Sequence, residues 1–182
     1  MLSGHAARCT QINLSANQFC GLDLNGWGTY SAADIKVIAQ SIAVSRSLSS
    51  IDISGNHISD DGARALASAI SSATSTSTLH ALRCDALDLN AEMTSLDLSN
   101  KDLGPADVEL VAAALNRFMA SVTSIDVAGN RITQEVALVL LGALKGKEMV
   151  RIGMAQCSLG GDGAEAVAEL VSSSRSLTQV LA

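Results

Sequence analysis

The sequence predicts an α/β solenoid, a single row of strand–turn–helix repeats with parallel strands on one face and helices on the other. Three observations predict this fold. The chain of 182 residues is 48% hydrophobic but only 2% aromatic, so Leu, Ile, Val and Ala fill its core, which suits thin repeated layers. One apolar pattern recurs along nearly the whole chain, and segments with helical spacing follow most of its occurrences.

The recurring pattern is L-x-x-L-x-L-x-x-N-x-L, a short strand followed by a tight turn. Its successive occurrences begin 39, 31, 14, 29, 27 and 28 residues apart. They begin at Cys9, Leu48, Leu79, Met93, Val122, Met149 and Leu177. The sequence therefore predicts one domain over residues 1–182, with about six repeats and a truncated seventh.

Apolar residues three and four apart predict the helices. They recur from Asp61 to Ile70 and from Asp162 to Val171, directly after two of the strands. Three residues mark helix starts by capping or by fitting the first turn, namely Ser31, Pro105 and Thr133. Because a strand–helix–strand connection is nearly always right-handed, successive strands should be parallel.

This unit resembles the ribonuclease-inhibitor-like class of leucine-rich repeats, over about Cys9 to the C-terminus. The resemblance implies a horseshoe with strands on the concave face and full helices on the convex face. The interval of 14 residues from Leu79 to Met93 departs from it. So does Leu87, which occupies a turn position held elsewhere by Asn. We expect this repeat to lack its helix.

The turn positions predict a structural ladder. A side-chain amide there can satisfy backbone groups of the adjacent repeat that would otherwise be buried without partners. Cysteine occupies the same position once, as it often does in this family, and its weak S–H donor accounts for it without a reactive role. The ladder residues are Asn17, Asn56, Asn130 and Cys157.

Charge and composition exclude several classes of partner. The net charge of −6 and the pI near 4.9 argue against nucleic acid and anionic membrane surfaces, and favour a protein partner with a basic surface. The apolar stretch from Val136 to Leu141 is far shorter than a membrane span. The four cysteines form no C-x-x-C pair and residues 1–8 contain no secretory core, so we expect reduced thiols and an intracellular, cytoplasmic protein.

The sequence contains no pattern of catalytic or metal-binding residues. The three histidines, His5, His57 and His80, are isolated. Glycines at positions 160, 161 and 163 lack the Lys-Ser/Thr ending and the spacing of phosphate-binding loops. Asp60 and Asp61 stand at a predicted helix start, where carboxylates cap N–H groups. We therefore expect no enzyme, no cofactor and no metal.

The outward positions at the centre of the strands predict a binding surface on the concave face. In chain order they are Asn13, Asp52, Arg83, Asp97, Asp126 and Gly153. Two interpretations stay open. The acids are common in this family and Arg83 offsets repulsion between them, or they form an acidic stripe that attracts a basic partner.

A second candidate surface is an insertion loop over residues 20–30, which makes the first repeat longer than the others. It holds the only Trp and the only Tyr, Trp27 and Tyr30, which are residue types common in binding hot spots. Trp27 either contacts a partner or covers the end of the solenoid.

The favoured function is a non-enzymatic protein–protein interaction scaffold, a subunit or fragment of a larger assembly. Neither end of the chain has a recognisable cap, so we expect both ends to be covered by other chains or by further repeats. The alternative is a regulatory leucine-rich repeat module, such as a Ran-type GTPase activator, the sensor region of an innate immune receptor or an actin-regulatory domain.

Overall fold

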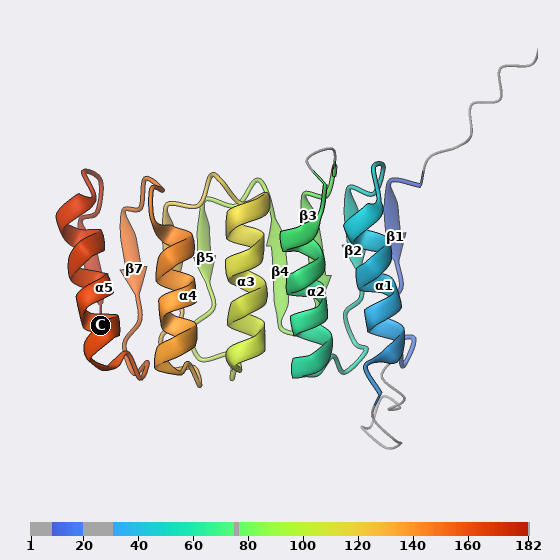
Figure 1. Ribbon diagram of the computed structural model, residues 1–182, viewed down its shortest axis with the longest axis horizontal. Helices are drawn as coiled ribbons and strands as arrows, with labels where there is room; N and C mark the ends of the chain where they lie inside the picture. Colours follow the sequence, from blue (N-terminus) through green and yellow to red (C-terminus); the bar gives the residue numbers. More distant parts are fainter. Residues whose placement is uncertain (1–8, 20–30, 75–76, 182) are drawn as a thin grey trace, which may run out of the picture.

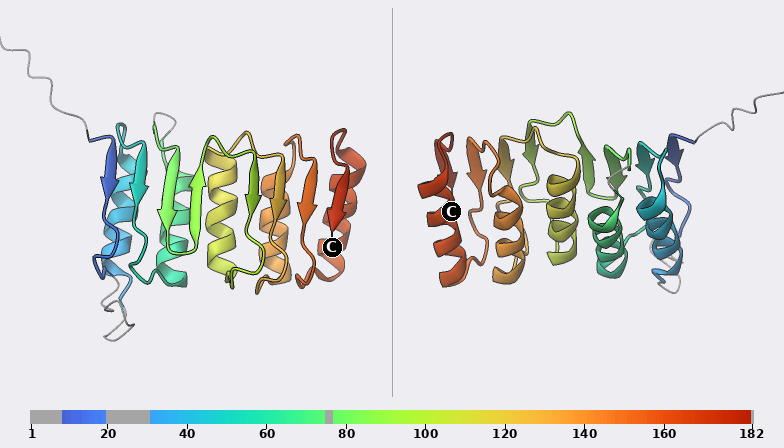
Figure 2. Two further views of the ribbon diagram at one scale, coloured as in Figure 1. Left: turned by 180° about the vertical axis from the view of Figure 1, so that it is seen from behind. Right: turned by 45° about the horizontal axis from the view of Figure 1, so that its top comes forward.

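The computed structural model of the chain describes residues 9–19, 31–74 and 77–181. Within these ranges a layer of strands packs against a layer of helices, and the repeats follow one another in a single row (Figure 1). Figure 2 shows the strand layer from behind, with the helices all on its other side. The α/β arrangement predicted from the repeats is therefore present.

The elements alternate as the repeat pattern predicts, with one exception between β3 and β5. In chain order they are β1 (Gln11–Asn13), α1 (Ala33–Val44), β2 (Ser50–Asp52), α2 (Asp60–Ser72), β3 (Ala81–Cys84), β4 (Leu87–Asn90), β5 (Ser95–Asp97), α3 (Pro105–Arg117), β6 (Ser124–Asp126), α4 (Gln134–Leu144), β7 (Arg151–Gly153), α5 (Gly160–Ser173) and β8 (Gln179–Leu181).

The strands form two four-stranded sheets, in the orders β1-β2-β3-β4 and β5-β6-β7-β8. Every pair except β3–β4 is parallel. Equivalent positions of neighbouring repeats lie opposite one another, as with Asp52 and Arg83 or Asp97 and Asp126. Within each sheet this common register aligns the outward residues at the ends of the strands.

The expectation that all strands are parallel is wrong at β4, which is antiparallel to β3. The chain reverses at Asp85 and Ala86, and Leu87 begins the second strand of a hairpin instead of occupying a repeat turn. The alternation of the sequence favours this, because Leu87 and Leu89 are buried while Asp88 between them is exposed. The short interval from Leu79 to Met93 contains no helix, as its length predicts.

The apolar core lies between the two layers. Strand centres such as Ile51 and Ile125 are buried, and helix residues such as Leu66 and Ile70 belong to the same apolar cluster. Helix α3, flanked by α2 and α4, is buried along most of its length, whereas α5 at the end of the row buries only Gly163 and Leu170. The core is thus one continuous stack of apolar layers.

The horseshoe curvature stays a prediction. Such curvature arises because packed helices are 8–10 Å apart and paired strands only about 4.8 Å apart. The β3–β4 hairpin works against it, because the hairpin widens the strand layer without adding a helix.

Candidate protein-binding surface

The exposed face of the strand layer carries the predicted row of polar residues. Asn13, Asp52 and Arg83 lie opposite one another in the first sheet, and Asp97, Asp126 and Gly153 do so in the second. The hairpin adds Asp88, which lies opposite Arg83. We define these residues, from Asn13 to Gly153 and including Asp88, as the strand-face row.

Each acid at a strand end accepts hydrogen bonds from the residue two positions later. Asp52 Oδ1 accepts bonds from the N–H and the hydroxyl of Ser54, at 3.0 and 2.7 Å. Asp97 makes the same two contacts with Ser99, at 3.0 and 2.7 Å. These bonds stabilise the carboxylates, and the side-chain bonds from Ser54 and Ser99 are the main cause that lowers the pKa of Asp52 and of Asp97. Both acids are therefore charged at neutral pH, and both also hold their own turns.

Two arginines neutralise much of the strand-face row. Arg83 lies 3.9 Å from an oxygen of Asp52 and 4.0 Å from one of Asp88. Arg151 contacts Asp126 at 2.9 Å, and the Asp126 side chain is only 15% exposed. The Asp126 carboxylate lies over Gly153, where a Cβ atom would collide with it. The glycine in the row therefore makes room for this ion pair.

Asp97 and Asp88 are the acids of the row best placed to meet a partner. Asp97 is exposed and forms no ion pair within the described part of the chain. Asp88 is 64% exposed and its arginine contact is the longer of the two that Arg83 makes. Sequence reasoning missed Asp88 and Arg151. The alternation of Leu87 and Leu89 indicated that Asp88 faces outward. Arg151 stands two residues before Gly153, so alternation along the strand places it on the same face.

The turns beyond the strands contain the predicted ladder residues. Asn56 Nδ2 donates to the carbonyls of Leu14 and Ile53, and its Oδ1 accepts from the N–H groups of Asn17 and Phe19. Asn130 bridges its neighbouring repeat in the same way, with Nδ2 bonded to Leu98 and Val127 and Oδ1 to Lys101 and Leu103.

Three further residues form hydrogen bonds in the turns. The side-chain amide of Asn17, in the turn after β1, donates only to the carbonyl of Ser15 in its own turn among the bonds described. The Cys157 Sγ lies 3.6 Å from the carbonyl oxygen of Val127 in the preceding repeat, as an S–H donor would. Asp85, which sequence reasoning missed, accepts bonds from three backbone N–H groups of the turn before α2.

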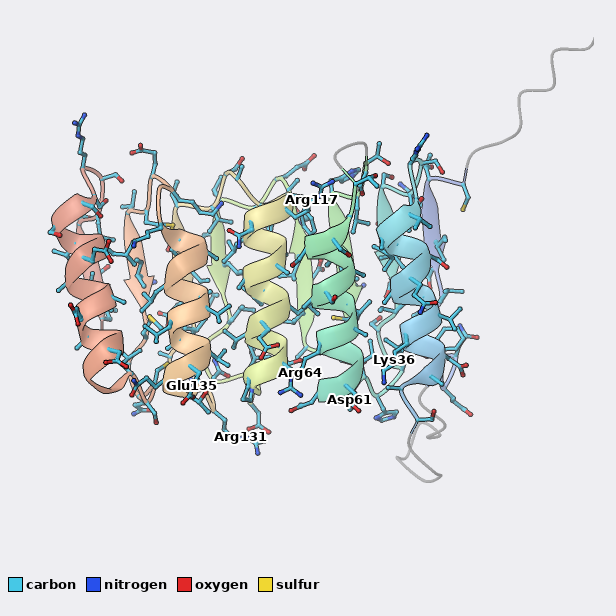
Figure 3. All side chains as sticks on the ribbon, in the orientation of Figure 1. Lys36, Asp61, Arg64, Arg117, Arg131 and Glu135 are labelled. Carbon is cyan, nitrogen blue, oxygen red and sulfur yellow. The ribbon has the colours of Figure 1, made fainter. Side chains whose placement is uncertain are left out.

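On the helix side the charged residues pair with one another across neighbouring repeats. Figure 3 shows Asp61, Arg64 and Arg131 toward the edge where the helices begin. Arg64 lies 3.6 Å from Glu109 on α3, and Arg131 makes two bonds to Asp102 at 2.8 and 2.6 Å. These exposed pairs contribute little to stability individually.

Several other predicted features can be located. Trp27 and Tyr30 lie outside the described residues. At the two ends of the row, apolar side chains are exposed on α1 (Val37 and Val44) and on α5 and β8 (Val171 and Leu181). Within the described ranges no three His, Cys, Asp or Glu residues are grouped as a metal site would require, and no helix is long and apolar enough to cross a membrane.

A family model described as a leucine-rich repeat matches residues 44–67. This segment runs from the last residue of α1 through β2 into α2, and a strand followed by a helix recurs at β1–α1, β5–α3, β6–α4 and β7–α5. The chain is a leucine-rich repeat protein. Among solved structures, the C-terminal domain of tropomodulin from Caenorhabditis elegans matches this leucine-rich repeat chain with a TM-score of 0.43 and 17% identity, covering 90% of this chain and 82% of that one. No curated protein matches the sequence.

Proposed function

We propose that this leucine-rich repeat protein is a non-enzymatic interaction scaffold that binds a basic surface of a partner protein through the strand-face row. The observation that carries the proposal is the common register of the strands, which aligns acids from distant repeats on one face. Asp97, exposed and without an arginine partner in the described chain, lies near the middle of that face. A basic partner would be attracted there and would replace water around the carboxylates.

A paired charge-reversal experiment tests this function. The native chain is used to capture partners from cell extract, and the captured proteins are identified by mass spectrometry. Asp97→Lys should abolish capture of a partner that binds the strand face. Glu165→Lys, on the exposed surface of α5, introduces the same change in charge on the helix side and should leave capture intact. Equal capture by both variants would contradict the proposal.

Association kinetics with the purified partner separate attraction from anchoring. Asp97→Asn should slow association and reduce its dependence on salt, because an exposed charge acts mainly on the encounter rate. Asp126→Asn should have the smaller effect, because Asp126 is already paired with Arg151.

Two further contacts are proposed, one at Trp27 and one at the ends of the row of repeats. If Trp27 anchors a partner, Trp27→Ala should speed dissociation. If it instead covers the end of a curved solenoid, the same change should lower the melting temperature before it affects binding. We also propose that the apolar end faces contact other chains or further repeats, since Val44 is 72% exposed and Val171 52%.

A further inference from the structure

We propose that the groove between β4 and β5 binds an extended segment of a partner protein, which adds a strand to the two sheets and places a basic side chain between Asp88 and Asp97. The inference rests on the proposed function and deepens it, because it names the part of the strand face that binds and the kind of peptide that fits. Figure 2 shows the place from behind, where α3 is visible between β4 and β5.

Both strands present unpaired backbone groups to the groove. The carbonyl of Arg83 accepts a hydrogen bond from the N–H of Ile53, on the β2 side of β3. In the antiparallel hairpin, Asp88 opposite Arg83 therefore directs its N–H and C=O away from β3. On either side of β5, the Thr94 carbonyl accepts bonds from the N–H groups of Thr123 and Ser124, and the Leu98 N–H donates to the carbonyl of Asp126, all on the β6 side. Ser95 and Asp97, between them, therefore direct their backbone groups away from β6 and toward β4.

The separation of the two strands suits one additional strand. No Cα atom of β4 lies within 8 Å of a Cα atom of β5. Directly paired strands are about 4.8 Å apart, and strands with one strand between them about twice that distance. The gap between β4 and β5 is therefore wider than the spacing of directly paired strands, and it leaves room for an additional strand.

A groove of about 210 Å³ occupies this interruption. Apolar side chains line its floor, among them Leu87, Met93 and Leu96, and Asp88 and Asp97 stand on its opposite walls. A strand laid in the groove would point alternate side chains at the floor and at solvent. The inward ones would be apolar, and the outward one between them would pass between the two carboxylates.

The charges of the walls select a basic residue at that outward position. Asp97 has no ion pair within the described chain, and Asp88 is 64% exposed with its arginine contact at 4.0 Å. Lys101 lines the groove beyond the end of β5, and its positive charge contributes to lowering the pKa of Asp97. A lysine or arginine flanked by two apolar residues is therefore the occupant that matches both the walls and the floor.

The test uses a short synthetic peptide of alternating valine and lysine as the probe, with alternating valine and glutamate as its control. Amide hydrogen exchange is followed residue by residue in the whole chain. Binding of the lysine peptide should slow exchange at the N–H groups of Asp88, Ser95 and Asp97 by about tenfold or more, because these amides gain hydrogen-bond partners. The glutamate peptide should leave them unchanged.

Two sets of variants separate strand addition from simple charge attraction. Ser95→Pro removes an N–H that faces the groove and should abolish the protection, whereas Ser95→Ala keeps that N–H and should preserve it. Asp88→Asn with Asp97→Asn should weaken peptide binding by about 3- to 10-fold. A lysine peptide methylated on its backbone nitrogens should fail to bind to the native chain, which makes the test independent of how well the proline variant folds.

Strand addition would be overturned if the lysine peptide bound without slowing exchange at the amides of Asp88, Ser95 and Asp97. It would also be overturned if the methylated peptide bound as tightly as the unmethylated one. The proposed function fails separately. If Asp97→Lys abolishes partner capture while the peptide leaves the groove amides unprotected, the strand face binds its partner by another geometry. If the peptide slows exchange at the groove amides but Asp97→Lys leaves partner capture unchanged, strand addition is supported and the proposed scaffold function is wrong.

Discussion

Asp85 holds the backbone of Ile58 across a repeat boundary, with its Oδ2 accepting a 2.6 Å hydrogen bond from the Ile58 N–H. Its Oδ1 accepts further bonds from the N–H groups of Gly55 and Asn56, at 2.9 and 3.3 Å. At the neighbouring boundary the amide oxygen of Asn56 has the same role toward the preceding turn. In the hairpin repeat, which has no turn asparagine, the Asp85 carboxylate therefore takes the role of the amide.

Replacing Asp85 should destabilise the fold. Asp85→Ala leaves three backbone donors of the turn without their acceptor, and because the site is exposed, water replaces part of the loss. We expect the free energy of unfolding, measured in urea, to fall by about 1 kcal/mol. Asp88→Ala, three residues away and facing solvent, serves as the control and should change it far less. Equal losses would show that the bonds to the turn contribute nothing specific.

Replacing Asn130 should cost more, because this residue is only 6% exposed and bridges two repeats. Asn130→Ala should lower the free energy of unfolding by about 1–3 kcal/mol, since buried backbone groups lose their partners. Its neighbour Arg131 forms an ion pair with Asp102 in which both side chains are about 75% exposed. Arg131→Ala should therefore have a much smaller effect. If the two variants unfold at the same urea concentration, the ladder is not a source of stability.

The repeat spacing predicted most of the fold because each strand and helix depends on residues close together in sequence. The interval from Leu79 to Met93 is too short for a helix, and none is present there. The hairpin in this interval could not be predicted as easily. Asp85-Ala86 is a weak turn signal compared with Asn-Gly or Asp-Gly, and only the buried positions of Leu87 and Leu89 distinguish a strand from a repeat turn.

The sequence predicted which residues of the candidate site face outward. It predicted less well which of their charges are paired. Alternation along each strand identified Asp52, Asp97 and Asp126 as outward-facing residues. Whether such an acid is available to a partner depends on the adjacent strand, which lies about 30 residues away in sequence. The pairing of Asp126 with Arg151 and the extra acid at Asp88 both depend on such neighbours, and so does the interruption between β4 and β5.

The pH dependence of stability should have opposite signs at two acids. Burial raises the pKa of the half-buried Asp107 in the folded chain, so the folded state binds the additional proton and loses stability as the pH rises from the ordinary aspartate pKa to the raised one. The hydrogen bonds from Ser99 lower the pKa of Asp97, so its contribution is present above the ordinary value and is lost as the pH falls through the lowered one.

Asparagine substitutions isolate these contributions. Relative to the native chain, Asp107→Asn should gain stability as the pH rises through the acid range, and Asp97→Asn should lose it. Urea unfolding of the three proteins at a series of acidic pH values measures both trends. Two curves that shift in the same direction would show that burial does not dominate at Asp107.

The cysteines should differ in reactivity by their environments. Cys84 is buried in the hairpin, and burial, with Asp85 as the next cause, raises the pKa of its thiol to about 12. Cys157 is half-buried, and burial raises its pKa as well, whereas Cys9 is exposed. Because the thiolate is the reactive form, an alkylating reagent at neutral pH should modify Cys9 first, Cys157 more slowly and Cys84 only after unfolding in urea. Peptide mapping by mass spectrometry follows each site separately. Rapid modification of Cys84 in the native chain would show that the β3–β4 hairpin opens readily, and that the groove beside it is not a preformed site.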